Sequence, residues 1–140
     1  MATRSTIAVV MPNGTVKQVY AHWDGYISHN GRILGEFYNT FEAAAALVEL
    51  GDISVLAERI IPSGKHSFDT PEKGCTIFYG RDRAEPGTGP RSFRNVKQFM
   101  QDRQVEEFNY LFINGDWLVH DEYNNSTERL VVLLTEEEDA

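Results

Sequence analysis

The chain has 140 residues, of which 41% are hydrophobic and 24% charged, and its formal net charge is −8. These values fit one globular domain, exclude bulk disorder, and argue against direct nucleic-acid binding. The lone cysteine, Cys75, excludes an internal disulfide framework and fits a reducing cytosol.

Charge is distributed unevenly along the chain. Residues 101–140 hold 2 Lys/Arg against 11 Asp/Glu, whereas residues 1–100 hold 11 against 10. We expect a single globular domain over residues 1–135 and a frayed acidic tail over residues 136–140. The alternative is that the acidic C-terminal third occupies a basic site on a partner. No signal-like pattern follows Met1, and no apolar run approaches the roughly 20 residues of a membrane helix, so we expect a cytoplasmic protein without membrane association.

Two strands are expected first, over residues 4–11 and 15–23. The pair Asn13-Gly14 between them favours a two-residue hairpin turn, because both positions of that turn need positive φ. The alternation of the second strand gives it two faces: Val19, Ala21 and Trp23 toward the expected core, and Gln18, Tyr20 and His22 away from it.

Helical signals follow. We expect a short helix over residues 32–38 and a longer one that Thr40 caps and Gly51 ends. Residues 52–61 fit strand and helix templates equally well. A strand is expected at residues 75–79, and the sequence PGTGP at residues 86–90 excludes regular structure there.

The last third has a second helix and a second hairpin. Ser92 is the expected N-cap of an amphipathic helix, and residues 108–113 and 117–120 are expected to pair around Asn114-Gly115. Residues 130–134 read as a final strand, with a helix as the alternative. These elements predict an α+β domain: a mostly antiparallel sheet of five or six strands with two or three helices packed on one face.

The stretch YAHWDGY at residues 20–26 concentrates polar and aromatic groups at a strand end. We expect His22, Asp24 and Tyr26 to open a site there. The spacing of the four histidines fits no known ligand pattern, so we expect neither a metal nor another cofactor.

The stretch YGRDR at residues 79–83 is the second feature. If it is extended, Tyr79, Arg81 and Arg83 point to one side, where guanidinium groups suit phosphate and a ring suits a base. The alternative is a surface ladder of ion pairs with Asp82 and nearby carboxylates.

Six blocks of sequence resemble a family of small proteins from tailed bacteriophages and prophages. They cover nearly the whole chain: TRSTIA (3–8), YxHWDGY (20–26), NGRIL (30–34), GDIS (51–54), FYxRDR (78–83) and FNYLF (108–112). The resemblance implies a phage setting, and hence the cytoplasm of a bacterial host, but no particular reaction.

Three functional hypotheses follow. The leading one is a counter-defence protein that binds a nucleotide-like, phosphate-bearing ligand. Its expected ligand-binding residues are His22, Asp24, Tyr26, Asn30, His66, Tyr79, Arg81 and Arg83. The second is an acidic inhibitor of a host nucleic-acid enzyme or defence protein, and the third is a small hydrolase that uses Asp24, His22 and His66. Each is compatible with self-association.

Overall fold

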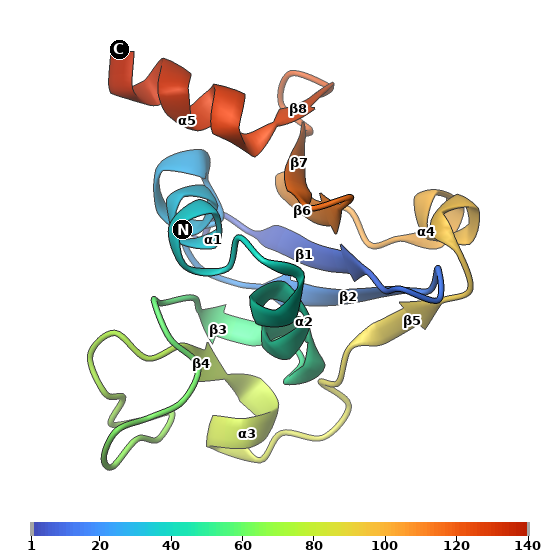
Figure 1. Ribbon diagram of the computed structural model, residues 1–140. Helices are drawn as coiled ribbons and strands as arrows, with labels where there is room; N and C mark the ends of the chain where they lie inside the picture. Colours follow the sequence, from blue (N-terminus) through green and yellow to red (C-terminus); the bar gives the residue numbers. More distant parts are fainter. Residues whose placement is uncertain (1, 140) are drawn as a thin grey trace.

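The computed structural model describes residues 2–139, in which eight strands form one sheet with helices packed against it (Figure 1). The strands are β1 (Ser5–Val10), β2 (Val16–Ala21), β3 (Ile53–Val55), β4 (Ile77–Phe78), β5 (Arg91–Phe93), β6 (Phe108–Ile113), β7 (Asp116–Asp121) and β8 (Ser126–Arg129). The helical elements are the π-helical turn η1 (Ile27–Gly31) and the α-helices α1 (Arg32–Phe37), α2 (Phe41–Glu49), α3 (Tyr79–Arg83), α4 (Val96–Asp102) and α5 (Leu130–Asp139). The predicted α+β class is confirmed.

The sheet is mixed, and the prediction of a mostly antiparallel sheet of five or six strands is wrong. Its strand order is β4-β3-β2-β1-β6-β7-β8, with β5 paired to β2 beside this path. The β1–β6 and β2–β3 pairs are parallel. The chain reaches β3 from β2 through η1, α1 and α2, and a helical crossover of this kind returns it in the same direction.

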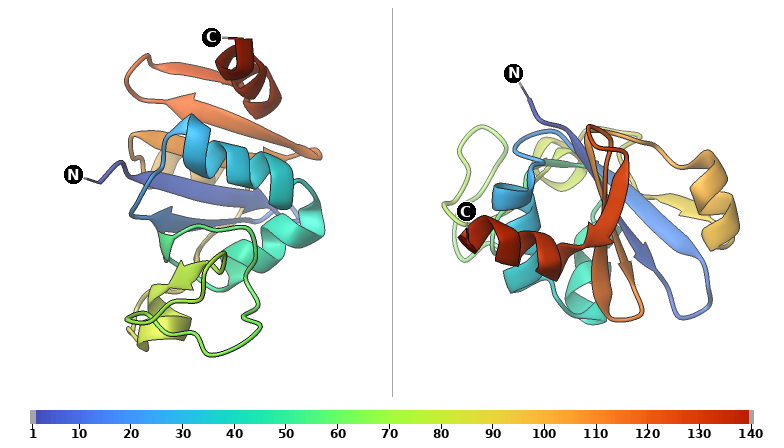
Figure 2. Two further views of the ribbon diagram at one scale, coloured as in Figure 1. Left: turned by 90° about the vertical axis from the view of Figure 1, so that its left-hand side faces the viewer. Right: turned by 90° about the horizontal axis from the view of Figure 1, so that it is seen from above.

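Helices cover both faces of the sheet, whereas the sequence predicted one face. Seen from above, α1, α2 and α5 lie on one side and α4 lies on the other (Figure 2). Two cores correspond to these layers. The larger core lies under α1, α2 and α5, and a smaller one on the opposite face contains Ala8, Val16, Phe93 and Phe99.

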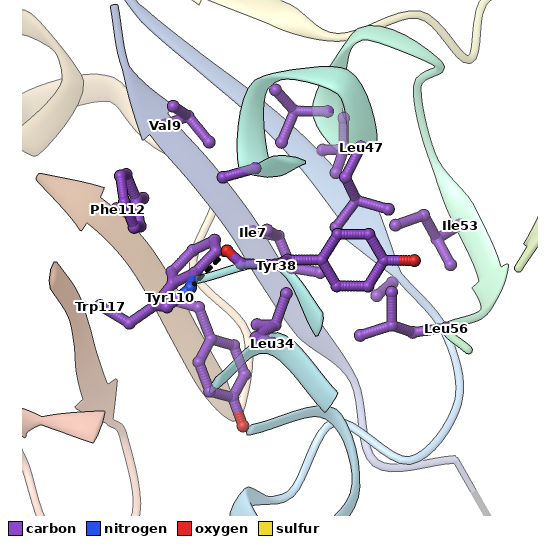
Figure 3. Close-up of a cluster of buried hydrophobic side chains, with 14 of the residues drawn as sticks. Ile7, Val9, Leu34, Tyr38, Leu47, Ile53, Leu56, Tyr110, Phe112 and Trp117 are labelled. Carbon is purple, nitrogen blue, oxygen red and sulfur yellow. Dashed lines mark hydrogen bonds between the residues drawn. The ribbon is translucent and has the colours of Figure 1, made fainter. Parts of the chain in front are cut away.

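The larger core joins strands from both halves of the chain (Figure 3). Trp117 on β7 is 1% exposed, and its indole N–H donates to the Tyr38 carbonyl oxygen at 3.1 Å. The Tyr38 hydroxyl in turn donates to the Ala57 carbonyl oxygen at 2.7 Å. Both polar tips are therefore satisfied inside an apolar layer, which is what allows these rings to be buried.

The predicted helix starts and turns are confirmed at several points. Thr40 Oγ1 accepts a hydrogen bond from the Ala43 N–H, and Gly51 follows α2 with a φ of +89°. The β6–β7 turn has positive φ at both Asn114 and Gly115, as a two-residue hairpin requires.

The first hairpin uses a different turn from the predicted one. Among its residues only Gly14 has positive φ, and the Met11 N–H donates to the Thr15 carbonyl oxygen at 2.7 Å. Pro12 holds φ negative at the first central position, which favours a type I turn followed by a left-handed glycine.

Two further predictions are wrong. Ser92 lies in β5, and the N-cap of α4 is Asn95, whose Oδ1 accepts from the Gln98 N–H at 2.8 Å. Residues 130–134 begin α5 rather than forming a strand, because Leu130 and Leu134 lie one helical turn apart and both approach Gly35 on α1.

Candidate functional site

Two segments distant in sequence meet on the face of the sheet opposite α1 and α2. Ala21 on β2 and Ile53 on β3 are register partners, and both are fully buried in the larger core. Because successive side chains of a strand point to opposite faces, Tyr20 projects to the other side. The backbone N–H of Tyr20 donates to Asp52 Oδ1 at 2.9 Å, and the backbone N–H of Tyr79 donates to the Asp52 carbonyl oxygen at 3.2 Å. The structure thus brings together the two segments that carry the predicted ligand residues.

Asp52 fixes this arrangement. Its carboxylate pairs with both terminal nitrogens of Arg91, at 3.1 and 3.2 Å, and its N–H donates to the Thr88 carbonyl oxygen at 2.8 Å. A bidentate pair of this kind constrains direction as well as distance. Gly51 is needed beside it, because a Cβ at this position would lie 2.2 Å from the Thr88 oxygen. The loop before β5 is therefore clamped to β3.

We call the rings of Tyr20, His22, Trp23 and Tyr79 the aromatic surface. Tyr20 Oη and His22 Nδ1 are 2.7 Å apart, and the rings of His22 and Trp23 meet edge to face with centroids 4.7 Å apart. The prediction that Trp23 faces the core is wrong: β2 ends at Ala21, and Trp23 is 41% exposed. The aromatic surface therefore consists of one exposed ring, Trp23, and three half-buried rings.

Arg4 borders the aromatic surface on one side. Arg4 lies close to the phenol of Tyr20. Partial burial raises the pKa of this phenol, and the positive charge of Arg4 lowers it. Glu106 and Tyr79 raise it further, so the pKa lies above its ordinary value. Arg4 is exposed, and within residues 2–139 its guanidinium forms no ion pair with a carboxylate. An anion beside Tyr20 would therefore find an available positive charge.

Arg83 is connected to the aromatic surface through Phe68. Its guanidinium stacks 4.9 Å from the ring centroid of Phe68, and that ring lies 5.7 Å from the ring of Tyr79. The Arg83 side chain is 54% exposed and its Nε is 3.8 Å from Glu85, a loose surface contact.

Asp24, Tyr26 and Asn30 shape the turn that follows β2. Asp24 has a left-handed backbone with a φ of 57°, and its Oδ1 accepts a hydrogen bond from Tyr26 Oη at 3.4 Å. Asn30 is fully buried, and its amide donates to the Trp23 carbonyl oxygen at 3.2 Å and to Ser5 Oγ at 3.4 Å. Asn30 therefore positions Trp23 from within the protein and has no surface for a ligand.

The stretch 79–83 is helical, so the extended backbone that would place both arginines on one side is not formed. Arg81 Nε donates to Asp82 Oδ1 at 2.9 Å, its Nη2 donates to the Thr76 carbonyl oxygen at 3.0 Å, and its Nη1 donates to the Ile60 carbonyl oxygen. The guanidinium also lies over the ring of Phe78, 4.8 Å from its centroid. Every nitrogen of Arg81 is thus occupied inside the protein.

His66 is a structural residue of the same network. Its side chain is 1% exposed, and its Nδ1 accepts a hydrogen bond from the Glu72 N–H at 2.9 Å. In the neutral ring the proton therefore lies on Nε2. Nε2 is 3.2 Å from Asp82 Oδ2, but the angle between these groups does not meet that of a hydrogen bond. Burial alone would raise the pKa of Asp82, but Arg81, the Phe78 N–H and His66 together hold it below its ordinary value.

Three cavities lie elsewhere on the molecule. One of about 100 Å³ lies between α1, α5 and β7, one of about 300 Å³ between α1, α2 and residues 58–61, and one of about 230 Å³ between α4 and the strands β6–β8. None of the eight predicted ligand residues lines any of them. The aromatic surface is consequently an open surface rather than one of these hollows.

The comparisons with known proteins give no relative from which a function could be read. No family model matches the chain, and neither a curated protein nor a solved structure does. Over residues 2–139 there is no cluster of three or more His, Cys, Asp or Glu side chains arranged to hold a metal ion, and no helix both long and apolar enough to span a membrane.

Three of the predicted ligand residues lie on or beside the aromatic surface, and three others have their polar groups engaged within the protein. His22 and Tyr79 lie on the aromatic surface and Arg83 beside it, whereas Asn30, His66 and Arg81 are engaged inside the protein. The alternation of the predicted strand placed Tyr20 on the same face as His22, but Tyr20 was not included in the predicted ligand set. Phe68 carries no such signal, because its place beside Tyr79 depends on how a loop returns to α3.

Proposed function

We propose that the protein binds a nucleotide-like, phosphate-bearing ligand on the aromatic surface, without turnover. The observation that supports this most strongly is that Asp52 accepts hydrogen bonds from the backbone N–H groups of both Tyr20 and Tyr79. The rings of His22 and Trp23 lie next to Tyr20. An exposed indole beside half-buried rings in a fixed arrangement suits the stacking of a base, and such stacking is tolerant of base identity.

We keep for Arg83 the phosphate-binding role that the sequence predicted for it, and give to Arg4 the role predicted for Arg81. Both are exposed: Arg4 lies beside Tyr20, and Arg83 stacks on Phe68, whose ring meets that of Tyr79. Within residues 2–139 Arg4 forms no ion pair, and Arg83 has only the 3.8 Å contact with Glu85. Guanidinium groups bind phosphate through paired donors. The overall charge of −8 opposes a long polyanion, so the ligand we propose is a small nucleotide rather than a nucleic acid.

The resemblance to phage proteins adds a biological setting to this proposal. In the cytoplasm of an infected bacterium, a protein that captures a signalling nucleotide would weaken a host defence that depends on that nucleotide. We propose this counter-defence role for the protein. The hydrolase hypothesis has less support, because His66 is 1% exposed and Asp24 Oδ1 is engaged by Tyr26.

Isothermal titration against a panel of mono-, di- and cyclic nucleotides tests the proposal. We expect at least one nucleotide to bind with 1:1 stoichiometry, and Tyr79→Ala to weaken it about ten-fold, the lower part of the range for loss of one stacked base. The matched control is Tyr123→Ala, which removes an exposed tyrosine from the far end of the sheet. Absence of binding by every nucleotide, or an equal loss in the control, would refute the proposal.

One observation favours a protein partner as the second candidate. Glu107 and Glu122 lie side by side where β6 begins and β7 ends, and the Glu122 N–H donates to the Glu107 carbonyl oxygen at 3.1 Å. Changing Glu106, Glu107, Asp121 and Glu122 to their amides should then abolish capture of a basic host protein, while Tyr79→Ala should leave it intact. Retained capture by the neutralised protein would eliminate this candidate.

A further inference from the structure

A cleft between α4 and the strands β6–β8 lies apart from the aromatic surface. Its volume is about 230 Å³. Met100 of α4 and Arg103, which follows α4, form one wall, Leu111 and Leu118 form the floor, and His120 and Thr127 lie at the rim on β7 and β8.

The floor of the cleft is apolar and incompletely covered. Leu111 on β6 and Leu118 on β7 are register partners, so their side chains lie next to each other on one face of the sheet. Both are only partly buried, and Met100 beside them is 52% exposed. Covering these side chains would remove apolar surface from water, which favours binding of an apolar group.

Arg103 is the cation of this cleft with donors to spare. It is partly buried, its guanidinium lies 6.0 Å from the ring centroid of Phe99, and within residues 2–139 it forms no ion pair. The other polar groups are satisfied: His120 Nδ1 is 3.0 Å from Thr127 Oγ1 and its Nε2 is 2.7 Å from Glu122. A positive charge without a partner beside an apolar floor is suited to one negative charge on an apolar body.

We propose that this cleft binds a small amphiphilic monocarboxylate, with its apolar chain on Leu111 and Leu118 and its carboxylate on Arg103. The volume corresponds to about eight water molecules, which suits a straight chain of about eight carbons. Glu122 contacts the rim residue His120, and Asp102 directly precedes Arg103 in the chain. Their negative charge disfavours a dianion such as a phosphate monoester. The proposal is independent of nucleotide binding on the aromatic surface.

Octanoate is the probe, and amide chemical shifts of the whole chain are the measurement. We expect saturable shifts at residues 100–103, 111, 118 and 127, with residues 20–23 and 79–83 unchanged. Arg103→Gln should weaken binding about ten-fold, the effect of losing a charge-assisted hydrogen bond. Octanol, which lacks the charge, should bind wild-type protein about as weakly as octanoate binds Arg103→Gln.

The matched control is Arg94→Gln, which removes the same charge from an arginine that does not line the cleft. This variant should bind octanoate like the wild type, and Thr127→Phe, which narrows the rim, should bind it less well while keeping the wild-type spectrum elsewhere. Octanoate that causes no saturable shifts, or binds Arg103→Gln and wild type equally, overturns the proposal. Tighter binding of octyl phosphate than of octanoate overturns the choice of a monoanion.

Discussion

At the scale of single residues, Asp82 has a more central role than any residue of the predicted ligand set. Its carboxylate is 4% exposed and meets Arg81, the Phe78 N–H and His66 at 2.8 to 3.2 Å. These contacts join α3, β4 and the loop over residues 62–74. A carboxylate enclosed in this way organises the backbone around it and is unavailable for catalysis.

Asp82→Asn should lower the free energy of unfolding by about 2–3 kcal/mol, because it leaves the guanidinium of Arg81 partly buried without its charge partner. Arg83→Gln is the control, since it removes an exposed charge from the same helix and should change stability by less than about 0.5 kcal/mol. Urea denaturation of both variants gives the two values. Equal stability of Asp82→Asn and wild type would contradict this role of Asp82.

Glu72 gives a prediction about pH. Hydrogen bonds from the backbone N–H of Ser63, from Arg59 and from the Ser63 hydroxyl lower the pKa of Glu72 to about 2, against an ordinary value of 4.5. Because the folded pKa is the lower one, the stabilisation is complete above pH 4.5 and is lost as pH falls toward 2. The protection factor for amide exchange at Ser63, which corrects for the intrinsic pH dependence of exchange, should therefore fall over this range in wild-type protein. Glu72→Gln should show no such pH step, and a step that persists in this variant would assign the effect to another group.

At the scale of elements, much of the fold could be predicted from sequence because its signals are local. Thr40 and Gly51 bound α2, and the Asn114-Gly115 pair sets the β6–β7 turn, without reference to the rest of the chain. The errors arise where distant contacts decide. Residues 79–83 become helical because Asp82 reaches back to the Phe78 N–H, and the mixed sheet depends on pairing between β1 and β6, about a hundred residues apart in sequence.

The N-terminus of α4 allows the predicted N-cap, Ser92, to be compared with the observed one, Asn95. Asn95→Ala should destabilise the protein by about 1 kcal/mol, because the Gln98 N–H loses its side-chain acceptor. Ser92→Ala should have an effect below about 0.5 kcal/mol, since Ser92 is exposed in β5. Thermal unfolding of the two variants compares them directly, and a larger loss for Ser92→Ala would contradict the assignment of Asn95.

The C-terminal helix α5 allows a buried residue to be compared with its exposed neighbour. Leu130 is 2% exposed whereas Val131 is 50% exposed, as expected for a helix with one buried stripe. Leu130→Ala should cost about 2–4 kcal/mol, and Val131→Ala less than about 1 kcal/mol. Chemical denaturation measures both. Similar losses in the two variants would mean that α5 does not dock against η1, α1 and β7.

At the scale of the whole molecule, the two faces of the sheet have different roles. The face under α1, α2 and α5 holds the larger core, whose largest buried side chains include Trp117 and Tyr110. The opposite face carries the smaller core under α4, the aromatic surface at one end and the cleft beside α4. The sequence could predict a site near His22, but not that it would be an open surface, because that depends on which helices cover which face.

Binding on the aromatic surface is tested most directly through Trp23, because it is 41% exposed there while Trp117 is 1% exposed. Acrylamide should quench the fluorescence of Trp23, and a saturating nucleotide should reduce that quenching in wild-type protein. In Trp23→Phe the nucleotide should have no effect on quenching. Quenching that is unchanged by every nucleotide, or a nucleotide effect that persists in Trp23→Phe, would contradict the proposal that this surface binds the ligand.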